Sequence, residues 1–172
     1  MNRVFTVADA AAMEVLGMHL AHVLHGGTVV YLRGGLGAGK TTLVRGVLRG
    51  LGFTGRVRSP TYTLMEGYEF PGRLFQHLDL YRIRAADELE FLGIRELDDP
   101  EQWVFVEWPE QGAGALPPPD LELNLHLREP GRRVQVEAPS GRGRSLAEAW
   151  RIGVQQAAVP GLAVPDWGDF SG

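Results

Sequence analysis

Residues 34–41, G-G-L-G-A-G-K-T, constrain the fold and chemistry of this chain more than any other segment. They match the pattern G-x-x-x-x-G-K-[ST] at every fixed position, which is typical of a loop that binds nucleotide phosphates. The glycines let consecutive backbone N–H groups turn toward one anion, Lys40 reaches the β- and γ-phosphates, and the Thr41 hydroxyl is offered to Mg²⁺. The predicted phosphate-binding residues are Gly35, Leu36, Gly37, Ala38, Gly39, Lys40, Thr41 and Thr42.

The segments on either side of this loop are those that such a loop requires. Residues 28–33, T-V-V-Y-L-R, form a continuous apolar and β-branched run, which predicts a buried strand. Residues 41–51 carry apolar side chains three and four positions apart, which predicts a helix. Strand, loop and helix therefore follow one another in the order that lets the positive N-terminal end of a helix face the phosphates.

Two other nucleotide-binding patterns are excluded. The dinucleotide pattern G-x-G-x-x-G fails, because its sixth position falls on Lys40 or Thr42 when it starts at Gly35 or Gly37. Lys40 is the only lysine among 17 basic residues, so the N-K-x-D pattern that selects guanine in regulatory GTPases has no lysine available. Arginine is a poor substitute for this lysine, since a compact ammonium fits between phosphates where a planar guanidinium does not.

The composition is that of an ordinary globular protein. A length of 172 residues suits one domain, and 44% apolar residues can form a substantial core. A net charge of −4 argues against a surface built to hold DNA, and the absence of cysteine fits a reducing compartment. No signal pattern and no apolar run of about 18 residues is present. We therefore expect a cytoplasmic protein that binds neither membrane nor DNA.

The remaining periodicities predict a three-layer α/β domain over residues 1–157, with a largely parallel sheet and an antiparallel hairpin near its C-terminal end. Further strands are expected at 3–7, 62–68, 73–78 and 103–107, with the hairpin at 121–136. Helices are expected after Asp9, near 87–92, and after a capping box formed by Ser145 and Glu148. Residues 158–172, including Trp167 and Phe170, are expected to form a flexible tail.

Two acidic residues are placed to complete a nucleotide site. Asp79 ends the apolar strand R-L-F-Q-H-L-D, and Glu107 ends W-V-F-V-E. An acid at the end of a neighbouring strand holds Mg²⁺ or orients the attacking water in phosphate-binding-loop enzymes, although solvated carboxylates at strand ends are also common. Between the loop and these strands lies S-P-T-Y-T, in which Pro60 fixes a bend. Thr61 is a candidate switch residue, or part of an ordinary turn.

With this combination of loop, switch segment and strand-end acids, the chain resembles the TsaE (YjeE) family, the bacterial phosphate-binding-loop ATPases needed to make N6-threonylcarbamoyladenosine on tRNA. The matching segments occur in the family's order, between about Val4 and Ala138. They are G-G-L-G-A-G-K-T-T-L-V-R-G, R-S-P-T-Y-T-L, H-L-D-L-Y-R, E-L-E-F-L-G-I-R and V-E-W-P-E. The family pattern often has Asp where this chain has Gly35, which removes one acid near the metal.

The resemblance implies an ATPase that requires ATP and Mg²⁺ and that acts on tRNA only indirectly. It implies docking on a complex of two partner proteins, TsaB and TsaD, whose repeated turnover ATP hydrolysis would support. By resemblance Lys40 binds phosphate, Thr41 and Glu107 are Mg²⁺ ligands, Asp79 is a catalytic or switch acid, and Thr61 is a switch residue.

Several functional alternatives stay open from the sequence. Trp108 either packs over the site or is a hydrophobic plug, and Arg132 either contacts the base or sugar of the nucleotide or is a solvated turn residue. Arg58 and Arg82 either stabilise transition-state charge or form salt bridges to Asp79 or Glu107. The alternative functions are a nucleotide-gated binding module and a small-molecule kinase. The acidic segment 87–99 does not resemble the arginine-rich lid of a kinase.

Overall fold

A computed structural model describes residues 3–168 of the chain. Its helices are α1 (Ala10–Val23), α2 (Lys40–Gly50) and α3 (Gly141–Ala157), and its short 3₁₀ helices are η1 (Ala86–Leu92), η2 (Ile94–Asp98) and η3 (Pro109–Gly112). Its strands are β1 (Val4–Val7), β2 (Thr28–Arg33), β3 (Met65–Phe70), β4 (Arg73–Asp79), β5 (Gln102–Glu107), β6 (Leu121–Arg128), β7 (Gly131–Glu137) and β8 (Leu162–Asp166). No helix of this part is both long and apolar enough to cross a membrane.

The strands form one eight-stranded sheet in the order β3-β4-β5-β2-β6-β7-β1-β8. The four central strands, β4, β5, β2 and β6, run parallel, as the α/β prediction requires. The pairs at both ends of the sheet are antiparallel, including the predicted β6–β7 hairpin. The carboxyl ends of β2, β4 and β5 therefore meet at one edge, where a parallel sheet binds its ligands.

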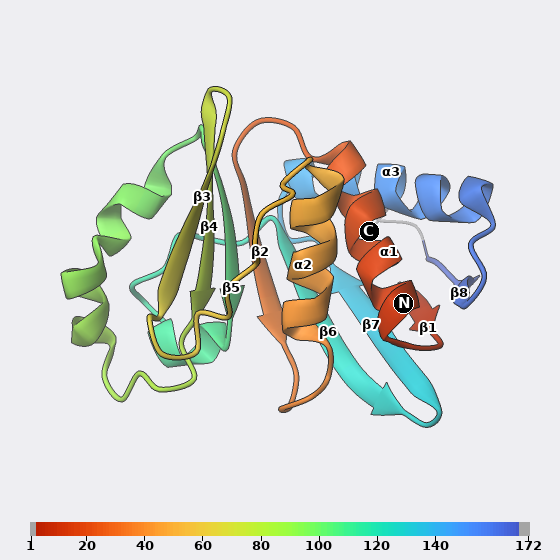
Figure 1. Ribbon diagram of the computed structural model, residues 1–172, viewed down its shortest axis with the longest axis horizontal. Helices are drawn as coiled ribbons and strands as arrows, with labels where there is room; N and C mark the ends of the chain where they lie inside the picture. Colours follow the sequence, from red (N-terminus) through yellow and green to blue (C-terminus); the bar gives the residue numbers. More distant parts are fainter. Residues whose placement is uncertain (1–2, 169–172) are drawn as a thin grey trace.

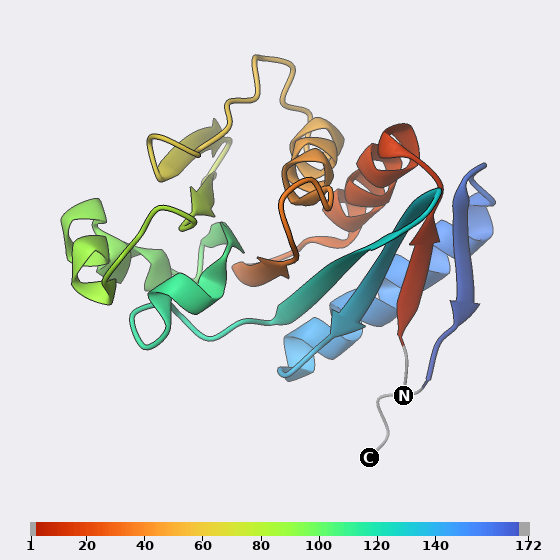
Figure 2. The ribbon, with the colours of Figure 1, turned by 90° about the horizontal axis from the view of Figure 1, so that it is seen from below.

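Helices cover the two faces of this sheet in separate layers (Figures 1 and 2). α1 and α2 lie on one face, over a core that includes Leu32 and Phe105. The 3₁₀ helices lie on the opposite face, over a second core that includes Tyr31 and Val106. Because side chains alternate across a strand, consecutive residues of β2 and β5 belong to different cores. Three layers result, as predicted.

α1 and α2 approach each other closely because glycine stands at their contact. A Cβ atom at Gly17 of α1 would lie 2.2 Å from the carbonyl oxygen of Leu43, and one at Gly46 of α2 would lie 2.0 Å from that of Glu14. Both clashes involve backbone atoms, which cannot move aside alone. The close contact fixes the position of the helix that follows the phosphate-binding loop.

We expect Gly46→Ala to lower the free energy of unfolding by roughly 3 kcal/mol, since the added methyl group overpacks the helix contact. Gly141→Ala is the matched control, because a Cβ there meets only the end of the Arg144 side chain, at 3.6 Å. Urea unfolding of both variants measures the difference. Equal midpoints for the two variants would contradict a tight α1–α2 contact.

Two predicted element boundaries are wrong. β3 begins at Met65 and not at Tyr62, because the N–H of Leu64 donates to the carbonyl of Pro60 and Leu64 has a left-handed φ of 66°. α3 begins before Ser145, since the Ser140 hydroxyl accepts from the N–H of Gly143 and caps the helix. Because glycine has a low helix propensity, the glycines at 141 and 143 did not indicate a helix start before Ser145.

The prediction of a flexible tail is also wrong for the described residues beyond 157. β8 pairs antiparallel with β1, and the ring of Trp167 lies 5.0 Å from that of Phe5. The carbonyl of Gly168 accepts a hydrogen bond from Arg3. The edge of β1 pairs with β8 and the ring of Phe5 packs against Trp167, and composition alone did not predict either contact. The tail prediction for Phe170 lies outside the described residues.

Candidate functional site

The phosphate-binding loop leads directly into the first turn of α2. Gly37 and Gly39 have φ values of 77° and 106°, a backbone conformation that favours glycine. Lys40 is 5% exposed, and its Nζ donates to the carbonyls of Gly34 at 2.7 Å and Gly35 at 2.9 Å. The loop therefore wraps around the lysine ammonium.

Trp108 packs over this lysine and also against the second core, so the structure shows features of both alternatives for that residue. The Nζ atom of Lys40 lies 4.6 Å from the centroid of the Trp108 ring, within the range of a cation–π contact. Trp108 has a left-handed φ of 56°, and its ring also lies 5.0 Å from that of Tyr81. The strained backbone after β5 turns the indole ring back over the loop.

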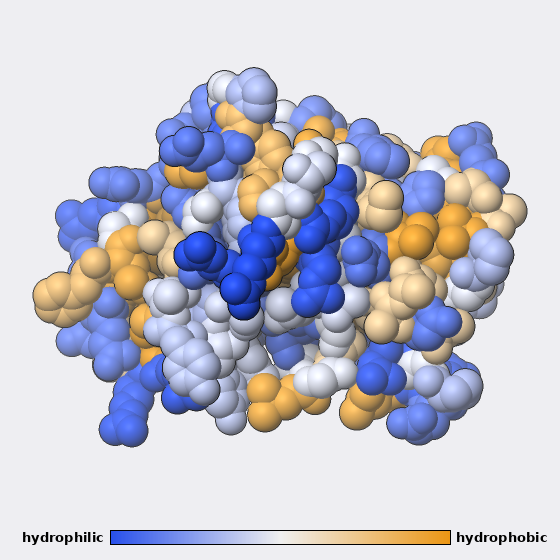
Figure 3. Space-filling view, in the orientation of Figure 1, coloured by the Kyte–Doolittle hydropathy of each residue, from blue (hydrophilic) through white to orange (hydrophobic). Residues whose placement is uncertain are grey.

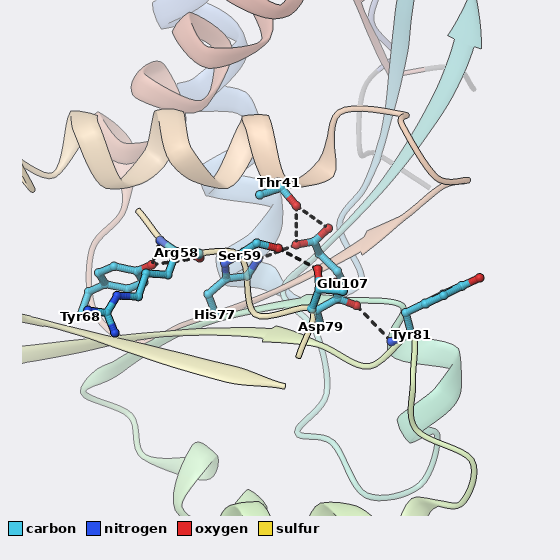
Figure 4. Close-up of polar contacts among 9 residues, drawn as sticks. Thr41, Arg58, Ser59, Tyr68, His77, Asp79, Tyr81 and Glu107 are labelled. Atoms are coloured by element: carbon cyan, nitrogen blue, oxygen red, sulfur yellow. Dashed lines mark hydrogen bonds and ion pairs between the residues drawn. The ribbon is translucent and has the colours of Figure 1, made fainter. Parts of the chain in front are cut away.

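The two predicted carboxylates come together beside the loop (Figure 4). In the parallel pairing of β4 and β5, Asp79 lies opposite Glu107, and both are buried. The hydroxyl of Thr41, the second residue of α2, lies 3.1 Å from each carboxylate oxygen of Glu107. The structure thus brings the hydroxyl and the carboxylate of the predicted metal site into direct contact.

Burial opposes charge on Asp79 and on Lys40. Burial raises the pKa of Asp79, and the nearby Glu107 carboxylate adds to this rise, while the N–H of Tyr81, 3.0 Å from Oδ1, opposes it. Burial also lowers the pKa of Lys40, against the opposing effect of Glu107, Asp79 and Glu110. A phosphate anion beside Lys40 would favour the charged form of its ammonium.

We expect Asp79→Asn to become less destabilising, relative to the wild type, as the pH rises from about 4 to 7. A carboxyl group whose pKa is raised by folding contributes stability that is complete below its unfolded-state pKa and is lost as the pH rises through its folded-state pKa. Asparagine has no such loss and still accepts from Tyr81. Urea unfolding at several pH values measures the difference, and a constant difference across this range would contradict the raised pKa of Asp79.

The loop and the carboxylates line a pocket of about 240 Å³. Its other lining residues include Thr61 and Trp108. The hydroxyl of Thr61 lies 2.7 Å from that of Ser59, within the turn that precedes β3. Residues predicted from the phosphate-binding motif and from the strand ends therefore line one pocket together with Thr61.

A second pocket of about 350 Å³ adjoins the other side of the same loop. Arg132, Gly37, Gly39 and Thr42 line it, and the guanidinium of Arg132 donates to the carbonyl of Gly37 at 3.2 Å. Arg132 is therefore in contact with the loop, and its contact with a base or sugar stays a prediction. The remaining lining residues were not foreseen from the sequence: Ala8, Asp9, Ala10, Met13 and Pro130.

Comparison with known proteins adds a separate line of evidence. Residues 7–134 match a family model described as "Threonylcarbamoyl adenosine biosynthesis protein TsaE". The chain belongs to the TsaE family. A curated relative from Haemophilus influenzae, the tRNA threonylcarbamoyladenosine biosynthesis protein TsaE, is 39% identical over 149 residues, which cover 84% of this chain and 94% of the relative. A relative of the same name from Nostoc sp. is 44% identical over 118 residues, covering 64% and 70% of the two chains.

A solved structure has a similar fold. The crystal structure of YdiB from Bacillus subtilis superposes with a TM-score of 0.72 at 26% identity, covering 88% of this chain and 97% of that one. The TsaE family match includes the loop, Thr61, Asp79, Glu107 and Arg132. It ends within β7, so α3 and β8 lie beyond the matched residues.

Salt bridges from Arg58 and Arg82 to Asp79 or Glu107 were one of two alternatives for these residues. Within residues 3–168, no ion pair joins either arginine to Asp79 or Glu107. The guanidinium of Arg82 instead lies 4.5 Å from the centroid of the Tyr62 ring. The backbone N–H of Arg58 donates to the Tyr68 hydroxyl at 3.0 Å. A role for either arginine in charge stabilisation stays a prediction for this TsaE family member.

Hydrophilic side chains gather over α2 on the face that carries the loop (Figure 3). Arg45 and Arg49 of α2 are both half-buried. Arg49 donates to the carbonyls of Phe53 at 2.9 Å and Gly55 at 2.7 Å. It therefore ties the end of α2 to the segment that follows, a structural role in this TsaE fold.

One buried residue beside the TsaE loop was missed by the sequence analysis. The imidazole Nε2 of His77 lies 2.6 Å from Oε2 of Glu107, and His77 is fully buried. The sequence feature that could have identified His77 is its position two residues before Asp79, which places both side chains on one face of β4. The partner is 30 residues away in sequence, so the contact was not visible in the local pattern.

Proposed function

We propose that the chain binds ATP with Mg²⁺ and hydrolyses ATP to support formation of N6-threonylcarbamoyladenosine on tRNA, together with the TsaB–TsaD complex. The observation that carries the proposal is the contact between Thr41 and Glu107 at the N-terminus of α2, beside the buried ammonium of Lys40. Phosphoryl transfer in this class of enzyme requires a phosphate-binding loop, a helix N-terminus and a carboxylate at the end of a neighbouring strand. Here these are the loop before Lys40, the start of α2 and Glu107. The partner and the pathway come from the resemblance and from the printed names of the relatives.

The residues present fit a magnesium ion. The Thr41 hydroxyl and the Glu107 carboxylate offer the oxygen ligands that Mg²⁺ prefers, 3.1 Å from each other. Within residues 3–168, no group of three or more His, Cys, Asp or Glu side chains could hold a metal by itself. Mg²⁺ usually binds through one or two carboxylates together with substrate phosphates and water. When bound, such an ion would neutralise phosphate charge during transfer.

The other residues of the two pockets bind phosphate, orient water, sense the γ-phosphate or hold the base and sugar. Lys40 stabilises negative charge on the β- and γ-phosphates, and the N-terminus of α2 adds its dipole. Asp79 faces the same pocket and orients the attacking water, while Thr61 reports the presence of the γ-phosphate as a switch residue. The second pocket holds the base and sugar beside Arg132.

Titration calorimetry and phosphate release test this proposal directly. We expect ATP and ADP to bind in the presence of Mg²⁺, GTP to bind more weakly, and phosphate to be released from ATP. With TsaB, TsaD and tRNA present, we expect repeated formation of threonylcarbamoyladenosine to require hydrolysable ATP. Binding of ATP without measurable phosphate release, under conditions that sustain tRNA modification, would contradict the hydrolytic part of the proposal.

A nucleotide-gated binding module is the second candidate function, favoured by the exposed surface next to the pocket. Tyr62 follows Thr61 and is 81% exposed, so a ligand sensed by Thr61 could change a surface available to a partner protein. Its test is retention of nucleotide-dependent partner binding and full tRNA modification in a variant that cannot hydrolyse ATP.

A further inference from the structure

His77 and Glu107 form a buried pair behind the candidate metal site. His77 lies on β4 and Glu107 on β5, and the parallel register of these strands places His77 opposite Phe105, two residues before the carboxylate. His77 is fully buried and Glu107 is 3% exposed, and Nε2 lies 2.6 Å from Oε2. In Figure 4 the carboxylate lies between the His77 ring and the Thr41 hydroxyl.

The other ring nitrogen of His77 identifies which atom carries the proton. Nδ1 is buried, and it has no hydrogen-bond partner among residues 3–168. A proton on Nδ1 would leave a buried donor unsatisfied, which is costly, whereas a proton on Nε2 completes a hydrogen bond to Glu107. The imidazole therefore donates from Nε2 to the carboxylate. This hydrogen bond orients the carboxylate.

Thr41 alone does not fix the direction of the Glu107 carboxylate. Its hydroxyl has one proton and lies 3.1 Å from each of the two carboxylate oxygens. The hydroxyl oxygen can bind a cation through a lone pair while its proton stays hydrogen-bonded to Glu107, so this contact does not distinguish Oε1 from Oε2. Among the described side chains that form hydrogen bonds with Glu107, His77 contacts Oε2 alone.

We propose that His77 is a positioning residue that anchors Oε2 of Glu107 so that Oε1 stays directed toward Thr41 and the bound cation. This inference rests on the proposed function, since it assumes a nucleotide-bound cation. Asp79 lies opposite Glu107 in the sheet and repels its carboxylate. Without the hydrogen bond from His77, this repulsion and the rotational freedom of the Glu107 side chain would move its carboxylate away from the bound cation.

Binding of Mn²⁺ with ADP, followed by electron paramagnetic resonance, tests this role without measuring turnover. In His77→Leu we expect the affinity for Mn²⁺ in the presence of ADP to fall about 10- to 100-fold, the range for loss of a group that orients a metal ligand. In His77→Gln an amide N–H replaces the imidazole N–H, so we expect affinity within a few-fold of the wild type. ADP affinity in EDTA should be the same in all three proteins.

Two controls separate positioning from general loss of packing. Phe75 lies on the same face of β4 and is fully buried against Phe105, with ring centroids 4.8 Å apart, so Phe75→Leu removes packing without touching Glu107. We expect it to leave Mn²⁺ affinity unchanged. In a Glu107→Gln background, His77→Leu should cause no further loss, because its effect acts through the carboxylate.

The outcomes are distinct. Equal loss of Mn²⁺ affinity in His77→Leu and Phe75→Leu would overturn the role of His77, as would a His77→Gln variant no better than His77→Leu. Unchanged Mn²⁺ affinity in His77→Leu would overturn it too. A wild-type protein that binds no Mn²⁺ in the presence of ADP would instead refute the proposed metal-dependent function itself.

Discussion

Replacing Lys40 by alanine will reduce ATP hydrolysis by at least about 10²-fold and weaken ATP binding, the largest functional loss we expect from one substitution. The ammonium is held by the carbonyls of Gly34 and Gly35 at the centre of the loop, and the chain has no second lysine that could take its place. Phosphate release and titration calorimetry measure the two effects. With TsaB and TsaD present, threonylcarbamoyladenosine formation should no longer proceed through repeated turnovers.

Lys40→Arg is the matched control for charge. Arginine keeps the positive charge, but its planar guanidinium does not fit a loop that closes around a compact ammonium. We therefore expect the arginine variant to fail nearly as completely as the alanine variant, with both still folded by circular dichroism. Many turnovers of tRNA modification by the alanine variant would refute the ATPase hypothesis.

Glu107→Gln should reduce ATP hydrolysis by about 10²-fold or more while ADP binding in EDTA is retained. Glutamine has nearly the same shape but no charge, so it loses the attraction for Mg²⁺ and keeps an oxygen that accepts from Thr41 or His77. Because ADP binding depends mainly on the loop and on α2, it should change little. Single-turnover phosphate release separates this loss of chemistry from slow product release.

This variant also distinguishes an enzyme from a nucleotide-gated binding module. If hydrolysis drives the turnover of TsaD, threonylcarbamoyladenosine formation should fall together with phosphate release. If Glu107→Gln loses hydrolysis and yet sustains full tRNA modification, the chain acts through nucleotide binding alone. Partner binding measured with ATP and with ADP completes the comparison.

The parts of the site that were predictable have local signatures. The loop is contiguous from Gly35 to Thr42, and its motif is specific because each position has a separate physical requirement. Asp79 and Glu107 were identifiable because each ends an apolar strand, and parallel strands bring such ends together. The central parallel sheet followed from the same strand, loop and helix order.

The rest depends on contacts between distant segments. His77 resembles any buried histidine in a strand until β5 is placed beside β4 with Glu107 at the end of its run. The second pocket combines Asp9 and Met13 from the start of the chain with Arg132 from the β6–β7 hairpin. That combination requires β1 to pair with β7, a pairing for which the composition of the short segment 4–7 carries no signal.

The position of β1 in the sheet has a consequence for biosynthesis. β1 is synthesised before both of its neighbours in the sheet, β7 and β8, which come from residues beyond 130. The strand therefore lacks both partners until these residues have been synthesised, and such long-range pairing folds slowly and exposes strand edges to aggregation. Since Ala8 and Asp9 follow β1 directly, the second pocket is completed last, and a nascent chain can form its phosphate-binding loop well before the rest of its site.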